Sequence, residues 1–306
     1  MDAGRAAHRR VVCGGDAVTV VDRRAPSQTA STVVGELEAF YNGSDAYHQH
    51  LREHDQSYFA SYCQLVQSAV TTGDVILDVG CGTGASSQAL GDAGYRCVGV
   101  DLALRYLLDA VGRRARDVSF ATGRAAELPF RDGVFAAVGM CQVIEHLPDV
   151  EAALAETVRV LQPGGALIIL SPNLLSPFPP LRDLARLLVG RPGRPGWGER
   201  PGQAWSLLWQ NLALSWRKAR SRGWAFTFRQ PCLDGRVIGW DADAVFLANP
   251  FDLVGWLRHR GFGIVRVAIG ASAAGRWAAR LTPYLAGEMA IIARKPHKAF
   301  VADWHR

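Results

Sequence analysis

The sequence predicts an α/β protein with a doubly wound, mostly parallel sheet of seven strands and a lid insertion after the fifth strand. Apolar segments of strand length alternate with helical segments of about ten residues, a pattern typical of a parallel sheet covered on both faces. The first strand, at residues 75–79, enters the glycine-rich turn Gly80-Cys81-Gly82-Thr83-Gly84, and a helical segment follows directly. The alternation stops after residue 173 and resumes at residue 250.

Composition limits the class of protein. The chain has 306 residues, of which 49% are hydrophobic and 20% charged, and its net charge is +6. These values favour a packed core and permit an anionic partner. The six cysteines are scattered without a CxxC or Cys/His spacing, so we expect neither a bound metal nor a disulfide framework. With no secretory signal and no apolar run of membrane-spanning length, we expect a cytoplasmic protein, with attachment to the inner membrane face still open.

The N-terminal part predicts a flexible arm at residues 1–35, in which residues 18–21 are able to pair locally. From residue 36 to 70, aromatic and aliphatic residues recur at helical spacing. Tyr47 and His48 lie in this segment and are candidates for a substrate pocket, because a helix preceding the glycine turn is able to cover it. Ordinary packing of an N-terminal helix is the equally weighted alternative.

The remaining elements follow in order. Residues 36–173 and 249–295 are predicted to form the main domain, residues 174–248 the insertion and residues 296–306 a tail. A separate turn is expected at residues 162–165, which read Gln-Pro-Gly-Gly. Strands are expected at 75–79, 95–100, 118–121, 134–141, 166–170, 264–269 and 288–293, and helices at 86–93, 103–115, 150–161 and 250–260.

The glycine turn and the second strand together predict a pocket for an adenosine-type ligand. Glycines allow a sharp turn and a close approach of the backbone to a ligand, and the next helix directs its free N–H groups there. A tight strand-to-helix connection without a ligand is the simpler alternative. Asp101 ends the second strand about twenty residues later, where a carboxylate accepts hydrogen bonds from a ribose diol.

Five motifs occur together in order. They are Val75–Gly84, Gly99-Val100-Asp101, Glu127-Leu128-Pro129-Phe130, Val143-Ile144-Glu145-His146-Leu147-Pro148-Asp149 and Leu161-Gln162-Pro163-Gly164-Gly165. The set resembles the class I S-adenosylmethionine-dependent methyltransferases, closest to the ubiquinone and menaquinone methyltransferase branch, methyltransferase type 11. The resemblance covers residues 40–171, and residues 250–293 would complete a Rossmann-like fold.

The resemblance implies S-adenosylmethionine as cofactor and assigns its contacts residue by residue. Two positions depart from the family pattern: Arg124 stands where an adenine-binding Asp is common, and Ala136 replaces an Asp of the fourth strand. Asp101 would bind the ribose, Leu102 the adenine face and backbone at Ala125 the adenine edge. Asp78, Gly80, Cys81, Gly82, Gly84 and Gln142 would surround the methionine part.

The loop after the fourth strand carries the candidates for catalysis. Methyl transfer is a displacement at a sulfonium carbon and needs a general base only when the acceptor keeps its proton, as a hydroxyl does. His146 is the first candidate base, with Glu145 and Asn173 facing the same region. Packing at a helix N-terminus beside Pro148-Asp149 is the alternative role of His146.

The insertion contains six of the nine tryptophans and about twice as many basic as acidic residues. Trp205 and Trp209, at helical spacing, are substrate-pocket candidates. Three interpretations of the tryptophans remain open. They form a lid core, they line an apolar acceptor tunnel, or they belong, with Arg217–Arg222, to an interfacial helix on anionic lipid. No nucleic-acid motif is present, and the oligomeric state is not predicted.

We therefore expect a methyltransferase for a small or lipid-linked acceptor, most simply O-methylation within lipid or secondary-metabolite biosynthesis. A sugar or natural-product tailoring enzyme, with N- or C-methylation, and a non-catalytic cofactor-binding partner or sensor are the alternatives.

Overall fold

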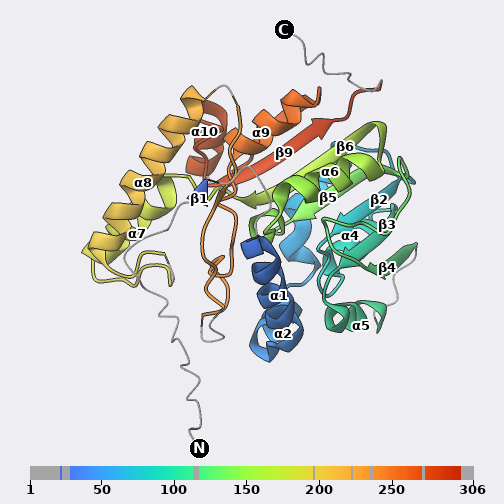
Figure 1. Cartoon of the computed structure of the whole chain (residues 1–306), viewed down its shortest axis with the longest axis horizontal. Helices are drawn as coiled ribbons and strands as arrows, with labels where there is room; N and C mark the ends of the chain where they lie inside the picture. Colours follow the sequence, from blue (N-terminus) through green and yellow to red (C-terminus); the bar gives the residue numbers. More distant parts are fainter. Residues whose placement is uncertain are drawn as a thin grey trace, which may run out of the picture.

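The structure, a computed structural model, describes residues 21–22, 28–112, 117–195, 197–221, 223–233, 237–270 and 273–297. Its centre is a seven-stranded sheet with the order β4-β3-β2-β5-β6-β9-β8 (Figure 1). All paired neighbours are parallel except those of β9, so the predicted α/β, mostly parallel, Rossmann-like fold is confirmed. The strands are β2 (Val75–Val79), β3 (Arg96–Asp101), β4 (Val118–Thr122), β5 (Phe135–Cys141), β6 (Leu161–Pro172), β8 (Gly263–Ala268) and β9 (Glu288–Arg294).

Helices cover both faces of the sheet because alternate side chains of each strand point to opposite faces. Leu77 and Val79 join a core with α6 (Val150–Val160) and α9 (Pro250–His259), in which Trp256 is fully buried. Ile76, which precedes Leu77 and points to the other face, joins a second core with α3 (Ala60–Gln67) and α4 (Ala85–Asp92). The strands are therefore apolar on both sides, as their continuous hydrophobic sequence predicts.

The strand order creates a switch point between β2 and β5. From β2 the chain moves outward to β3 and β4, and it then returns to the other side of β2 as β5. In open parallel sheets, ligands bind outside the carboxyl ends of the two strands that flank such a point. The glycine turn follows β2, and the segment with Glu145 and His146, the 3₁₀ helix η2 (Ile144–His146), follows β5.

The N-terminal region differs from the predicted boundaries. Helix α1 (Gln28–Gly43) begins within residues 1–35, which were expected to be a flexible arm. Strand β1 (Val21–Asp22) overlaps the predicted pairing segment, residues 18–21, at Val21, and it pairs antiparallel with the distant β7 (Thr227–Phe228), whereas local pairing was expected. Helix α2 (Asp45–Arg52) and the 3₁₀ helix η1 (Gln56–Phe59) complete the expected helical cover. The remainder of the predicted arm, and residues 298–306 of the tail, lie outside the described residues.

Two further expectations are corrected. The Gln-Pro-Gly-Gly sequence does not separate a helix from the fifth strand, because β6 already begins at Leu161. Its four residues form a bulge, since the partner of β5 shifts from Leu161 to Ala166, and Gly164 supplies the positive φ of +77° that the bulge needs. Helix α5 (Leu104–Gly112) matches its prediction, whereas α10 (Ala273–Leu281) lies in a segment where no helix was expected.

The insertion contains helices α7 (Phe178–Leu188) and α8 (Pro201–Arg220), which lie side by side at one end of the molecule (Figure 1). Lys218 on α8 pairs with buried Asp252 on α9, with Nζ and Oδ2 separated by 2.6 Å. Phe226 and Phe246 belong to the same core as the sheet and α9. The insertion is therefore packed into the main domain. Within the described ranges, no helix is long and apolar enough to cross a membrane.

Candidate active site

The glycine turn adopts a backbone that other residues would strain. Gly80, Gly82 and Gly84 have φ values of +70°, +51° and +79°. A Cβ on Gly80 would lie 2.4 Å from a methyl group of Val143, on the loop after β5. Glycine thus permits the left-handed conformation and brings the two loops of the switch point together.

Asp101 connects the turn to the end of β3. Its Oδ2 accepts from the Gly82 N–H at 2.9 Å, and its Oδ1 accepts from the Ala103 N–H at 2.8 Å. Burial raises the pKa of Asp101 to about 6. A cavity of about 130 Å³ opens beside it, and Leu102, Ala125 and Gln142 also line this cavity. These are the residues assigned to adenosine and its neighbourhood, so the structure brings that predicted set together.

A second cavity of about 410 Å³ adjoins the first. Gly80, Gly82, Gln142, His146 and Tyr47 line both of them, and Cys81 lines the second. The further lining comes from two segments far apart in sequence: His50, His54 and Tyr58 in the N-terminal cover, and residues 238–241 and 243 in the insertion. The second cavity has room for the methionine part of a cofactor and for an acceptor.

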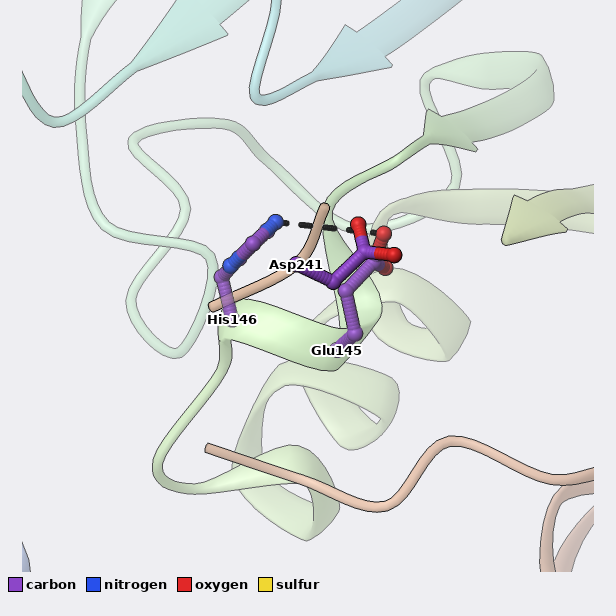
Figure 2. Close-up of side chains that lie close together, drawn as sticks. All are labelled: Glu145, His146 and Asp241. Carbon is purple, nitrogen blue, oxygen red and sulfur yellow. Dashed lines mark ion pairs between the residues drawn. The ribbon is translucent and has the colours of Figure 1, made fainter. Parts of the chain in front are cut away.

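Three acidic side chains surround His146: Asp241 and Asp243 line the second cavity with it, and Glu145 lies fully buried behind them. His146 Nδ1 lies 3.3 Å from Asp243 Oδ2, and His146 Nε2 lies 3.8 Å from Glu145 Oε1. Asp241 completes the group, which we call the acid–imidazole cluster: Glu145, His146, Asp241 and Asp243. Figure 2 shows the His146 ring directed toward the carboxylates of Glu145 and Asp241. Glu145 and His146, which are adjacent on η2, thus lie beside the carboxylates of Asp241 and Asp243 from the insertion.

The environment changes the pKa values of the cluster. Burial raises the pKa of Glu145 and that of Asp241. Burial disfavours the charged imidazole of His146, but Asp243, Glu145 and Asp241 outweigh burial and raise its pKa. Perturbed ionisable groups at a cavity wall are typical of sites that move protons.

Hydrogen bonds hold the backbone of Glu145 and the carboxylate of Asp243 in place. The Glu145 carbonyl accepts from the N–H groups of Val245 and Phe246 at 2.8 and 2.9 Å. Tyr41 donates its hydroxyl to Asp243 Oδ2 at 3.0 Å in a buried contact. The N-terminal cover, the loop after β5 and the insertion are thus joined at one point.

Two residues assigned to the cofactor lie behind the turn instead. Asp78 is buried and lines neither cavity at the turn, because its oxygens accept from the hydroxyls of Ser86, Ser87 and Tyr62 at 2.6, 2.7 and 2.9 Å. A Cβ on Gly84 would meet Ala110 and Phe120, so this glycine allows packing within the fold. The expectation that Asp78 receives the cofactor ammonium does not match this geometry.

Three substrate-pocket candidates, His48, Trp205 and Trp209, line none of the cavities at the site, and a fourth, Asn173, lines only a third cavity. His48 turns away from the cavities and pairs with Asp109, with Nε2 and Oδ2 separated by 2.8 Å. Asn173 donates to the carbonyls of Tyr284 and Ala286 and lines a third cavity of about 640 Å³. Trp205 and Trp209 are 50% and 55% exposed. Helix α8 buries its other face, so the tryptophans do not form a lid core.

Sequence reasoning missed Asp241 and Asp243. They follow η2 by nearly one hundred residues, in a segment without regular periodicity, and no motif connects them to His146. The sequence carried only a weak signal. Asp241 and Asp243, with one residue between them, directly follow Gly239-Trp240 in a segment with few acidic residues. Arg124 is also accounted for, because it pairs with Glu38 at 2.6 Å and leaves the adenine edge to backbone groups.

The fold and the site place two cavities at the switch point of an α/β sheet, where enzymes of this architecture bind nucleotide-type cofactors. The family described as a methyltransferase domain matches residues 77–169. These residues form a class I S-adenosylmethionine-dependent methyltransferase domain, as the motifs imply.

Curated relatives support the same class. The demethylmenaquinone methyltransferase of Renibacterium salmoninarum is 41% identical over 109 residues, which cover 35% of this chain and 45% of that protein. The demethylmenaquinone methyltransferase of Thermobifida fusca is 33% identical over 138 residues, covering 44% and 54%. The chain spans about half the length of the curated relatives it matches.

A solved structure shares the fold. It is 1,6-didemethyltoxoflavin-N1-methyltransferase of Burkholderia thailandensis, with bound 1,6-didemethyltoxoflavin and S-adenosylhomocysteine. At 15% identity the match covers 90% of this chain and 95% of that one, with a TM-score of 0.53.

Proposed function

We propose that the protein transfers the methyl group of S-adenosylmethionine to an oxygen atom of a small or lipid-linked acceptor. The observation that carries the proposal is the acid–imidazole cluster, which forms a wall of the cavity next to the glycine turn. An acceptor hydroxyl has to lose a proton as it reacts, and this cluster is the group placed to assist that loss.

The reaction follows from the two cavities. Asp101 and its neighbours hold the adenosine part, and the glycine turn faces the methionine part, so the sulfonium lies near Gln142 and His146. The acceptor oxygen attacks the methyl carbon, the carbon–sulfur bond breaks, and neutral S-adenosylhomocysteine leaves. The protein contributes mainly alignment and exclusion of water. His146 and Glu145 are the proposed catalytic residues.

The third cavity favours an elongated acceptor. It lies behind Trp240 and Asp241, which line both it and the second cavity. Apolar side chains form much of its wall, among them Leu174, Phe178 and Leu207, and Asn173 lies at its edge. A polar head in the second cavity and an apolar tail in the third would use both spaces. An acceptor that is linked to a lipid has this form.

The surface around this cavity favours contact with lipid. Helices α7 and α8 expose large apolar side chains, including Leu181, Leu188 and the tryptophans at positions 205, 209 and 216. The Arg220 guanidinium lies 4.8 Å from the ring centre of Trp216. Tryptophan and arginine together suit the boundary between lipid headgroups and acyl chains. We include an anionic membrane surface among the proposed partners and exclude nucleic acid.

Calorimetry and an acceptor series test the reaction. We expect S-adenosylhomocysteine to bind and radiolabelled methyl groups to pass to a prenylated phenol faster than to the same phenol without its tail. Preference for a sugar or an amine would replace the O-methyltransfer proposal with the tailoring alternative. Cofactor binding without transfer to any acceptor in the series would favour the sensor alternative.

Liposome flotation tests the lipid surface. The triple variant Trp205→Ser, Trp209→Ser, Trp216→Ser should lose binding to vesicles that contain anionic lipid. The matched control is Leu108→Ser on α5, because Leu108 is 68% exposed and α5 lies far from α8 (Figure 1). Equal flotation of the wild type and the triple variant would remove the membrane from the proposal.

A further inference from the structure

We propose that Glu145, His146 and Asp241 bind a divalent transition-metal ion at the wall of the second cavity. Their ligand atoms all lie within 4.8 Å of one another. Two of them are neighbours on η2, and the third comes from the insertion (Figure 2). The inference rests on the proposed function, because it states how the acceptor hydroxyl is activated there.

Glu145 gives the strongest indication of a missing ligand. Its side chain is fully buried, and its Oε2 accepts from the Ser171 hydroxyl at 3.1 Å. Its Oε1 has no hydrogen-bond partner among the described residues, and it is directed toward His146 Nε2 at 3.8 Å. An unpaired buried carboxylate oxygen costs several kcal/mol unless a counter-charge reaches it. A cation between Glu145 and His146 would provide this charge.

Asp243 is placed to orient the imidazole for this role. Its Oδ2 lies 3.3 Å from His146 Nδ1, which makes no hydrogen bond among the described residues, and Tyr41 donates to the same oxygen. Nε2 is left to face Glu145 and Asp241. Histidines that bind metals usually present one ring nitrogen to the metal and the other to a carboxylate or carbonyl. Asp243 therefore acts as a positioning residue, and His146 is a ligand through Nε2.

The charge of the cluster also favours a cation. Glu145, Asp241 and Asp243 bring three carboxylates into one buried region. Two arginines oppose Asp241, namely Arg194 and Arg229. Arg194 is itself paired with Asp183, so Arg229 is left to oppose the three carboxylates. A divalent ion would balance the remaining negative charge.

The position of Asp241 is set by the fold. Trp197 donates its indole N–H to the Trp240 carbonyl at 2.7 Å. Trp240 and Asp241 both have positive φ values, +58° and +55°. Two consecutive non-glycine residues in this conformation are costly, and such strain is concentrated at functional sites. The loop therefore directs a carboxylate to a specific place.

The ligand chemistry narrows the class of ion. One imidazole nitrogen and two carboxylate oxygens fit Mn²⁺, Fe²⁺ or Zn²⁺, whereas Mg²⁺ and Ca²⁺ favour sites made of oxygen alone. Three protein ligands leave positions for an acceptor oxygen. The ion would bind the acceptor hydroxyl and lower its pKa, so that the O–H bond breaks and the proton passes to solvent. The oxyanion then attacks the methyl carbon.

Mn²⁺ binding tests the site without reference to turnover. Mn²⁺ is titrated into the full chain, and free Mn²⁺ is followed by electron paramagnetic resonance. We expect the wild type to bind a single Mn²⁺. Glu145→Gln and Asp241→Asn should each bind at least about 10-fold more weakly. Circular dichroism and melting establish that each variant is folded.

Asp109→Asn is the matched control, because Asp109 also lies beside a histidine, His48, whose other ring nitrogen faces the Arg105 guanidinium at 3.1 Å instead of a second carboxylate. It should bind Mn²⁺ as the wild type does. No saturable binding by the wild type overturns the proposal, and so does equal binding by the wild type and folded Glu145→Gln.

Activity measurements separate this inference from the proposed function. If methyl transfer continues at an undiminished rate in the presence of a chelator, the proposed metal site is rejected. O-methyltransfer then still stands, with the cluster acting as an acid–base group. Rates that fall in the chelator and return with Mn²⁺ support the ion. A wild type that binds Mn²⁺ but methylates no acceptor would retain the site and reject the proposed function.

Discussion

Asp101 illustrates how one side chain can belong to the fold and to a proposed ligand site. Its oxygens accept from the N–H groups of Gly82 and Ala103, so the carboxylate is held in place where we propose that the ribose binds. A carboxylate has lone pairs left for ribose hydroxyls. Binding and stability are therefore connected at this residue, and its protonation affects both.

We expect cofactor affinity to increase about tenfold between pH 5 and pH 7, because Asp101 ionises near pH 6 in the folded protein. The free energy of unfolding should change in the opposite sense. Since burial raises the pKa above that of the unfolded chain, the folded state retains its proton and loses stability as pH rises through this window.

Asp101→Asn is the test variant for this window. Calorimetry with S-adenosylhomocysteine should show affinity reduced by about 10- to 100-fold, from one or two weakened charged hydrogen bonds. The pH dependence near 6 should be lost. A variant that keeps both affinity and pH profile would show that Asp101 does not bind the ribose.

At the level of residues, the sequence predicts what local chemistry dictates. Asp101, Leu102 and Ala125 line one cavity, as a strand end and a motif predict. Asp78 lies behind the turn instead, because a motif does not reveal which face of a strand a side chain occupies. Asp241 and Asp243 depend on a long-range approach that no local pattern encodes.

The glycine turn shows that an element can require residues without a side chain. We expect Gly80→Ala to lose about 2–5 kcal/mol of unfolding free energy, from left-handed backbone strain and overlap with Val143. Gly73→Ala separates the two causes, because Gly73 has φ of +92° and nothing within 4 Å of an added Cβ. It should lose only about 1–2 kcal/mol. Equal losses in denaturant titrations would mean that the Val143 contact is relieved without cost.

Helix α8 is attached to the main domain by a buried ion pair. Lys218→Met should lose about 3–5 kcal/mol, because Asp252 would remain buried without its cation. Arg124→Met is the control. It breaks the Arg124–Glu38 pair, whose side chains are 55% and 39% exposed, and should lose less than about 1 kcal/mol. Similar losses in both variants would show that the Lys218 pair behaves as a surface contact.

Helical periodicity predicts that α8 exists, but it does not predict which face is buried. The tryptophans at positions 205, 209 and 216 were compatible with an inward face, as a lid core or an acceptor tunnel, and with an outward face on lipid. The structure buries Ala204, Leu207, Asn211 and Ser215 instead, and Asn211 donates to the carbonyls of Leu174 and Ser176. The buried face is partly polar because its side chains form hydrogen bonds with backbone carbonyls of an irregular segment. Hydrophobicity alone does not reveal this requirement.

At the scale of the molecule, the insertion is part of one folding unit. Phe226 and Phe246 pack in the main core, and the Glu145 carbonyl binds backbone of the insertion. We expect replacement of residues 174–248 by a short linker to abolish cooperative melting. The triple tryptophan variant should keep it, because those side chains are exposed. A cooperative transition in the deleted protein would instead show an independent domain.

The sheet from β2 to β6 was predictable because each strand carries its own pattern and the connections between these strands are short. The alternation of elements predicts parallel strands, and the glycine turn identifies the switch point. The helix α10 and the bulge at Gly164 were not predictable. Each depends on packing against neighbouring elements.

Cys81 has a consequence for the durability of the enzyme. Its thiol lines the cavity proposed for the sulfonium, and sulfur is a good nucleophile for a methyl group only as thiolate. Burial raises the pKa of the Cys81 thiol well above its usual value, and the same holds for Cys141 on the same wall. Both therefore stay neutral beside a strong alkylating agent. Peptide mass spectrometry after prolonged incubation with S-adenosylmethionine should find neither cysteine methylated: the protein is protected from becoming its own substrate.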